Sequence, residues 1–140
     1  MKKNTTLFIA DDDEDDRTLF IESAKEVDPG IRCITASDGQ EALRLLKEES
    51  HPVPDYIFLD LRMPRVGGKK CLEEIRKDKR LLHVPVFIYT TSASAGDAVE
   101  LKKGGAVHFI SKPVNPGDIC YILSAILNEQ WDQLDSRVID

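Results

Sequence analysis

The chain has 140 residues, of which 41% are hydrophobic and 31% charged, and its formal net charge at pH 7 is −6. This composition is typical of a globular protein, and the length suffices for one domain with one core. The acidic balance argues against a nucleic-acid-binding surface, which needs a concentrated basic face. No apolar run approaches the ~20 residues of a membrane-spanning helix.

The cysteines and the N-terminal residues indicate the compartment. Residues 1–4 include two lysines but lead into no apolar stretch or cleavage site, so we predict no secretory signal. Cys33, Cys71 and Cys120 are widely spaced and form no CxxC pair, which favours small apolar fillers over a disulfide or zinc site. We therefore expect a cytoplasmic protein with a single domain over residues 1–140.

Five short apolar runs alternate with segments of helical periodicity. Runs of four or five residues bounded by turn or charged residues are typical of strands buried on both faces of a parallel sheet. The expected strands are Thr6–Ala10, Ile31–Thr35, Tyr56–Asp60, Val86–Thr90 and Val107–Ile110. Their strict alternation with helices predicts an α/β fold with right-handed crossovers.

The first two helices are located by their ends. The first is expected from about Asp13 to Val27, before Pro29-Gly30. The second is expected to open at Ser37, which forms a capping-box signature with Gln40. Apolar residues at helical spacing predict the buried sides of both helices, namely Leu19, Phe20, Ala24, Val27, Ala42, Leu45 and Leu46.

The remaining three helices follow later in the chain. The third is expected between Gly67-Gly68 and about Lys79, and the fourth is closed by Gly104-Gly105, a good C-terminal stop. In the fifth, Asn115 supplies an N-cap and Pro116 the first helical position. Its apolar stripe is Ile119, Ile122, Leu123, Ile126 and Leu127.

Residues 128–140 form an extension of a domain core that we place at about residues 5–127. Trp131 and Leu134 would continue the stripe of the fifth helix, either by lengthening it or by building a homodimer surface. The extension is too short for a DNA-binding or catalytic module.

Polar residues stand at the carboxyl ends of four expected strands. They are the acidic cluster Asp11–Asp13, Asp60, Thr90 and Lys112. In an open parallel sheet, ligands bind outside the carboxyl ends of the strands, where the strand order reverses. One edge would therefore gather carboxylates, a hydroxyl and an ammonium. Such a set can hold a divalent cation and can accept and neutralise a phosphoryl group.

The acidic run Asp11–Asp16 has plainer interpretations. Carboxylates are favoured at a helix N-terminus by about 0.3–1 kcal/mol each, which suffices for Asp13–Asp16. A calcium-binding loop would use Asp11, Asp13, Asp15 and Glu22, but its sixth position needs glycine and is Asp16 here. The DxD pattern of aspartyl-phosphate hydrolases would make Asp11 the nucleophile of a phosphohydrolase. That enzyme remains the alternative function.

Asp60, Thr90 and Lys112 suit phosphoryl chemistry better together than singly. Carboxylates accept phosphoryl groups covalently, and Asp11 and Asp12 could hold Mg²⁺ beside Asp60 to offset charge repulsion. Thr90 could donate its hydroxyl to a phosphoryl oxygen, although such hydroxyls often only cap helices. Lys112 could pair with Asp60 if its side chain points inward, which a cis Lys112-Pro113 bond would favour.

At this point the sequence resembles the response-regulator receiver domains of two-component signalling, over about residues 5–127. The matching segments are residues 8–13, 58–64, 86–91 and 105–113. The resemblance implies a flavodoxin-like, doubly wound sheet of order 2-1-3-4-5 with five helices. It also implies a single-domain signalling switch that is not an enzyme in the usual sense, although it assists its own phosphorylation and autodephosphorylation.

The resemblance assigns roles to residues of this chain. Asp60 would be the phospho-acceptor, taking its phosphoryl group from a sensor histidine kinase or a phosphotransfer protein. The implied Mg²⁺ ligands are Asp11, Asp12, Asp60 and the backbone carbonyl of Arg62. Thr90 and Lys112 would contact the phosphoryl group, and Thr90 with Phe109 would form the switch. The surface of the fourth helix, fifth strand and fifth helix would then bind a protein target.

Some positions depart from the family pattern. Gly67 stands where many receivers have aspartate, Arg62 and Ser92 lie where the family tunes phosphoryl lifetime, and Phe109 lacks a tyrosine hydroxyl. We interpret His108 as structural, because strand alternation directs it away from the site. A flavin carrier of the same fold is disfavoured, because the acids after the first strand would repel its phosphate.

Overall fold

The computed structural model describes residues 4–91 and 95–131. The strands are β1 (Thr6–Ala10), β2 (Arg32–Ala36), β3 (Tyr56–Leu59), β4 (Val86–Thr90) and β5 (His108–Ser111). The helices are α1 (Glu14–Val27), α2 (Gly39–Lys47), α3 (Gly68–Lys77), the 3₁₀ turn η1 (Lys79–Leu81), α4 (Ala95–Lys103) and α5 (Gly117–Leu127). The predicted elements are therefore present, with ends that differ by one or two residues.

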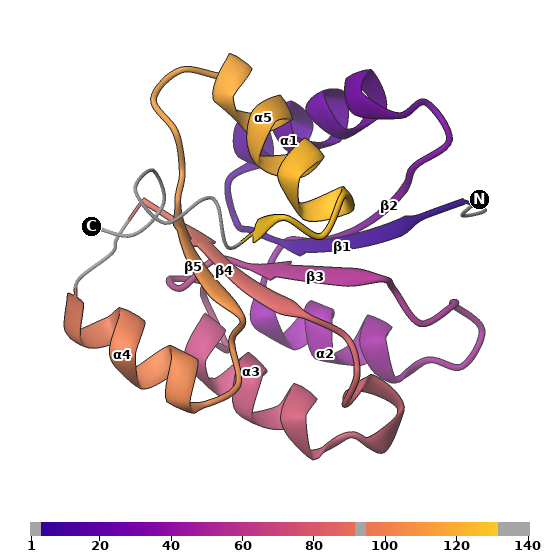
Figure 1. Ribbon diagram of the computed structural model, residues 1–140. Coiled ribbons are helices and arrows are strands. Elements are labelled where there is room, and N and C mark those ends of the chain that lie inside the picture. Colours follow the sequence, from indigo (N-terminus) through magenta and orange to yellow (C-terminus); the bar gives the residue numbers. More distant parts are fainter. Residues whose placement is uncertain (1–3, 92–94, 132–140) are drawn as a thin grey trace.

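The five strands form one parallel sheet of order β2-β1-β3-β4-β5, which confirms the predicted topology. Helices α1 and α5 cover one face of this sheet, and α2, α3 and α4 cover the other (Figure 1). The order reverses between β1 and β3, because β1 pairs with both β2 and β3. The carboxyl ends of β1 and β3 thus lie side by side.

Alternate residues of each strand supply two separate cores. On the α1 and α5 face, Phe58 stacks on Phe87 with ring centroids 5.2 Å apart, and Phe20 of α1 meets Phe58 edge-on at 4.9 Å. On the other face, Phe109 of β5 is 1% exposed and packs in the core beneath α2, α3 and α4. β1, β3 and β4 are buried on both faces, as expected for parallel strands, whereas the edge strand β2 is mostly half-buried, so that expectation is wrong for β2.

The predicted capping box at Ser37 is wrong by one residue. The N-cap of α2 is Asp38, whose carboxylate accepts from the Glu41 N–H at 2.8 Å. Glu41 in turn accepts from the Ser37 N–H at 2.7 Å, so Glu41 takes the part predicted for Gln40. A carboxylate is a stronger acceptor than a hydroxyl, which favours Asp38 as the cap. The predicted start of α5 is also early by one residue, because Pro116 is the N-cap and Gly117 the first helical residue, although the Asn115 side chain accepts from the Gly117 N–H at 3.0 Å.

The chain reverses after α5 instead of lengthening it, so that prediction for Trp131 is wrong. Glu129 has φ 58°, and the Gln130 N–H donates to the Ala125 carbonyl at 2.7 Å, which closes the helix. The Trp131 ring then packs edge-on against Phe87 and Tyr56, with centroids 5.7 and 6.3 Å away. Leu134 lies outside the described residues.

His108 lies on the α1 and α5 side of the sheet, as strand alternation predicts. Its Nε2 lies 2.9 Å from the carbonyl oxygen of Trp131, and the residue is 4% exposed. The contact joins the start of β5 to the end of the described chain, and it supports the structural interpretation of His108. None of the helices in the described part of the chain has the length and apolar character of a membrane span.

Replacing Trp131 with alanine should lower the free energy of unfolding by about 1–3 kcal/mol, because the ring fills the sheet face against Phe87 and Tyr56. Denaturant unfolding followed by far-UV circular dichroism measures this, since Trp131 is the chain's one tryptophan. Tyr121→Ala, which truncates a half-exposed aromatic on α5, is the control and should cost less. Equal losses would show that the Trp131 contacts contribute no special stability.

Candidate functional site

Asp11 directly follows β1 and is completely buried. Its N–H donates to the Ala36 carbonyl of β2 at 3.0 Å, which continues the strand pairing by one residue. Its Oδ1 accepts from the Asp13 N–H at 2.9 Å. Asp13 then caps α1 by accepting from the Asp16 N–H at 3.1 Å. The turn from strand to helix therefore fixes Asp11 at the rim, with the exposed Asp12 beside it.

Asp60 follows β3 and lies next to Asp11 across the strand pair. Its N–H donates to the Ala10 carbonyl at 3.0 Å, and its side chain is 10% exposed. The loop after it is tight, because the Gly68 N–H bonds the Leu61 carbonyl at 2.9 Å. A Cβ at Gly68 would lie 2.3 Å from the Asp60 carbonyl oxygen. Only glycine fits there, so Gly68 contributes to the placement of Asp60.

Lys112 directly follows the carboxyl end of β5, and its side chain reaches these carboxylates. Its backbone N–H donates to the Thr90 carbonyl at 2.9 Å. Its Nζ lies 2.6 Å from Asp11 Oδ2 and 3.0 Å from Asp60 Oδ2. No cis peptide bond occurs in the described residues, so the inward direction of Lys112 does not depend on the cis Lys112-Pro113 bond that the sequence left open. The ammonium points inward because the carboxylates surround it, and the side chain is 8% exposed.

Asp16 is the site residue that sequence reasoning missed. Its Oδ2 lies 2.8 Å from Lys112 Nζ, although we expected only a favourable charge at a helix N-terminus. The signal was its position in the first turn of α1, three residues after the cap Asp13, which directs it back toward the strand ends. Arg17 of the same turn donates to the Asp11 carbonyl at 2.6 Å.

Of the switch candidates, Thr90 is bonded to the backbone of Lys112, and Phe109 lies in the core. Thr90 ends β4, is 1% exposed and pairs with Ser111 of β5. Phe109 is already turned into the core. Arg62 is near Asp60 through a long contact of 3.4 Å from its N–H to Asp60 Oδ1, while the role of its carbonyl stays a prediction. Ser92 lies outside the described residues.

Burial and ion pairing set the charges of the site. Burial raises the pKa of Asp11 from 3.8 to about 6, although Lys112 and the Asp13 N–H counteract it. Burial alone would lower the pKa of Lys112. Its hydrogen bonds to Asp11, Asp16 and Asp60 outweigh that effect and raise it. Lys112 is therefore a permanent cation near neutral pH, whereas Asp11 releases its proton less readily than an ordinary carboxyl.

The donor set fits a small hard cation. Asp11, Asp12 and Asp60 each offer a carboxylate oxygen, and the three oxygens lie within 4.8 Å of one another. Oxygen ligands at this spacing suit Mg²⁺, which takes one or two carboxylates and keeps several waters. The calcium-loop interpretation fails, because Glu14–Val27 is helical and Asp13 is engaged as the cap.

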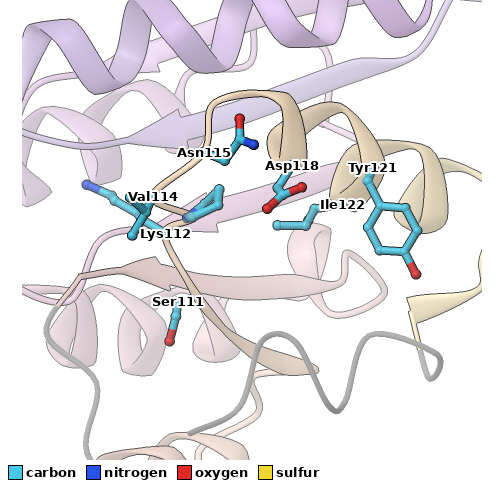
Figure 2. Close-up of a pocket in the computed structure, with 8 residues that line it drawn as sticks. Ser111, Lys112, Val114, Asn115, Asp118, Tyr121 and Ile122 are labelled. Carbon is cyan, nitrogen blue, oxygen red and sulfur yellow. The ribbon is translucent and has the colours of Figure 1, made fainter.

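A pocket of about 480 Å³ lies beside this cluster, at the junction of β5 and α5 (Figure 2). In the close-up, Asn115 and Asp118 line its upper side and Ser111 lies below them. The full lining is Ser111, Lys112, Pro113, Val114, Asn115, Asp118, Tyr121 and Ile122. The pocket shares only Lys112 with the carboxylate cluster, so it is a neighbouring surface and not the centre of the site.

The geometry defines an open α/β protein with a cluster of carboxylates around one lysine at the carboxyl edge of its sheet. The family model for the response regulator receiver domain matches residues 7–124. The chain therefore belongs to this family of two-component signalling proteins. The polar-differentiation response regulator DivK of Brucella ovis is 32% identical over 110 residues, which cover 79% of this chain and 85% of that protein.

Solved structures agree with this assignment. The Mn(2+)-bound form of the response regulator Rcp1 has a TM-score of 0.78 and 26% identity, covering 87% of this chain and 91% of that one. The phosphorylated cyanobacterial phytochrome response regulator RcpA has a TM-score of 0.81 and 27% identity, covering 91% and 94%. The receiver fold expected from the sequence is thus confirmed.

The stability of the metal-free protein should depend on the charge of Asp11. Its pKa of about 6 in the folded state exceeds the ordinary 3.8, so its protonation stabilises the fold below pH ~4. This contribution, about 1–3 kcal/mol, is lost as the pH rises through 6. Denaturant unfolding at pH 4 to 7 should show wild type losing stability relative to Asp11→Asn. A constant difference would contradict the raised pKa.

Replacing Gly68 with alanine should displace the loop that carries Asp60, because the new Cβ meets backbone atoms. We expect a loss of about 1–3 kcal/mol in the free energy of unfolding. Gly67→Ala is the matched control, since its Cβ would meet only the Leu61 carbonyl oxygen, at 3.3 Å. Denaturant unfolding compares the two variants, and equal stabilities would contradict the close approach.

Proposed function

We propose that the protein is a phosphorylation-dependent switch that accepts a phosphoryl group on Asp60. The observation that carries this proposal is the ammonium of Lys112, which lies within 3.0 Å of carboxylates from β1 and β3 at the edge where the strand order reverses. A carboxylate beside a fixed cation can act as an acceptor whose product is stabilised in place.

Asp60 is a better acceptor than Asp11. The Asp60 side chain is 10% exposed, whereas that of Asp11 is fully buried. One Asp11 oxygen accepts from the Asp13 N–H and the other pairs with Lys112. This favours the signalling function over the alternative, a phosphohydrolase with Asp11 as nucleophile.

The reaction transfers a phosphoryl group from a phosphohistidine of a sensor histidine kinase or phosphotransfer protein. An oxygen of Asp60 attacks phosphorus, the phosphorus–nitrogen bond breaks, and its electron pair returns to the imidazole. Lys112 holds the acceptor carboxylate and then a phosphoryl oxygen. Mg²⁺ held by Asp11, Asp12, Asp60 and the Arg62 carbonyl would supply positive charge against the transferred oxygens. The Mn(2+)-bound Rcp1 and phosphorylated RcpA structures support this by analogy.

The response would be a population shift in the surface of α4, β5 and α5. Thr90 would move toward the phosphoryl group, and Phe109, already inside the core, would favour the inward arrangement. Val107, Val114 and Tyr121 are exposed hydrophobic residues on or next to β5 and α5. They suit contact with a protein target, with no direct nucleic-acid or membrane binding.

The remaining features follow from this proposal. The protein would be one receiver domain over residues 1–140, would work in the cytoplasm, and would assist its own phosphorylation and autodephosphorylation without acting on other substrates. A homodimer also stays a proposal. Equilibrium sedimentation of wild type and Trp131→Ala tests it, and an unchanged mass would remove Trp131 from such a surface.

Incubation with acetyl phosphate and Mg²⁺ should place a phosphoryl group on Asp60. Reduction of the acyl phosphate with borohydride followed by peptide mapping locates it. Asp60→Asn should abolish the label, because the amide is not a nucleophile of this kind. Lys112→Met should lower the yield about 10-fold or more, since it removes the cation. Lys103→Met on α4 is the matched control and should keep the label. Label on Asp11 would instead support the phosphohydrolase.

A further inference from the structure

Three carboxylates surround the ammonium of Lys112. A lysine ammonium has three N–H donors and no acceptor. Its Nζ lies 2.6 Å from Asp11, 2.8 Å from Asp16 and 3.0 Å from Asp60. The ammonium donates hydrogen bonds to Asp16 and Asp60, whereas its contact with Asp11 is an ion pair. Phosphorylation converts the Asp60 carboxylate into an acyl phosphate, and its phosphoryl oxygens would then compete with Asp11 and Asp16 for the ammonium.

The three partners differ in how readily water can replace the lysine. The side chain of Asp11 is 0% exposed and that of Asp60 is 10% exposed, whereas that of Asp16 is 33% exposed. Breaking a buried ion pair leaves a charge without water and is costly. A carboxylate that reaches solvent is rehydrated when its partner leaves. Asp16 is therefore the partner that can be exchanged at least cost.

The backbone around Asp16 permits this exchange without loss of the helix. The Asp16 N–H is held by the carboxylate of the cap Asp13 at 3.1 Å, and the Arg17 N–H bonds the Asp13 carbonyl at 3.0 Å. These bonds do not involve the Asp16 side chain. The carboxylate can therefore rotate toward solvent while the first turn of α1 stays intact.

We propose that Asp16 is a positioning residue that holds Lys112 before phosphorylation and yields it to the phosphoryl group on Asp60. The inference rests on the proposed function and adds a regulatory residue to it. In the unphosphorylated protein, Asp16 competes for the donor that the phosphoryl oxygen needs, and its negative charge opposes the incoming anion. Asp16 thus lowers the occupancy of the phosphorylated state at a given donor level.

The test compares Asp16→Asn with Asp15→Asn. Both variants remove one negative charge from the same turn of α1, but Asp15 is exposed and is not among the partners of Lys112. Isothermal titration calorimetry with beryllofluoride, a tetrahedral mimic of the phosphoryl group, at saturating Mg²⁺ measures the affinity. We expect Asp16→Asn to bind beryllofluoride about 5- to 10-fold more tightly than wild type, and Asp15→Asn within about 2-fold.

Two further readouts separate competition for the lysine from a structural effect. In a Lys112→Met background, Asp16→Asn should no longer tighten beryllofluoride binding beyond Asp15→Asn, because the shared partner is gone. The affinity for Mg²⁺ alone should change equally in Asp16→Asn and Asp15→Asn. Thermal unfolding of Asp16→Asn confirms that the fold is retained, and Asp16→Ala repeats the comparison with a side chain that accepts no hydrogen bond.

The outcomes distinguish this inference from the proposed function. Equal affinities of Asp16→Asn and Asp15→Asn would overturn the inference, because only total charge would matter. Weaker binding by Asp16→Asn would also overturn it, since Asp16 would then assist the bound state. If wild type neither binds beryllofluoride with Mg²⁺ nor gains acyl phosphate on Asp60, the proposed function itself fails.

Discussion

The site depends on one cation among three carboxylates. Asp11, Asp16 and Asp60 come from β1, α1 and the end of β3, and their charges would repel one another if the Lys112 ammonium were absent. Removing a single partner of a buried ion pair is far more costly than its net contribution suggests. Lys112 therefore offsets part of the negative charge that the three carboxylates place together, and the cluster stays net negative. The cluster can therefore still bind a divalent cation through its carboxylates or a phosphoryl group through the ammonium.

The parallel sheet makes this convergence possible. β1 is flanked by β2 and β3, so the strand ends that carry Asp11 and Asp60 are neighbours although 49 positions separate them in the sequence. Lys112 reaches them from beyond β4, because its side chain is long and its backbone is held by Thr90. The two cores pack against the strands from both faces and so fix the strand ends that carry the site residues. The turn at Gly68 is fixed by its close approach to the backbone of Asp60.

Strand ends and their polar residues could be predicted from the sequence, because apolar runs of four or five residues report burial and a polar residue at their ends stands out. The partner of His108, the fold-back of Trp131 and the role of Asp16 could not. Each depends on a contact between elements distant in sequence, such as the 2.8 Å approach of Asp16 to Lys112. The N-cap of α2 is Asp38 and not the predicted Ser37. Both residues can accept a hydrogen bond at this position, and N-cap propensity alone does not choose between them.

The site and the surface that would report its state share one stretch of backbone. Lys112 contacts the carboxylates, and the next residues, Pro113 and Val114, line the pocket of Figure 2 together with Tyr121 of α5. Val114 is fully exposed. The proposed exchange of partners at the Lys112 ammonium would take place two residues from that surface, so coupling between them would need no long chain of intervening side chains. The lysine that offsets the charge of the carboxylate cluster is therefore also close to the surface on which the proposed partner would bind.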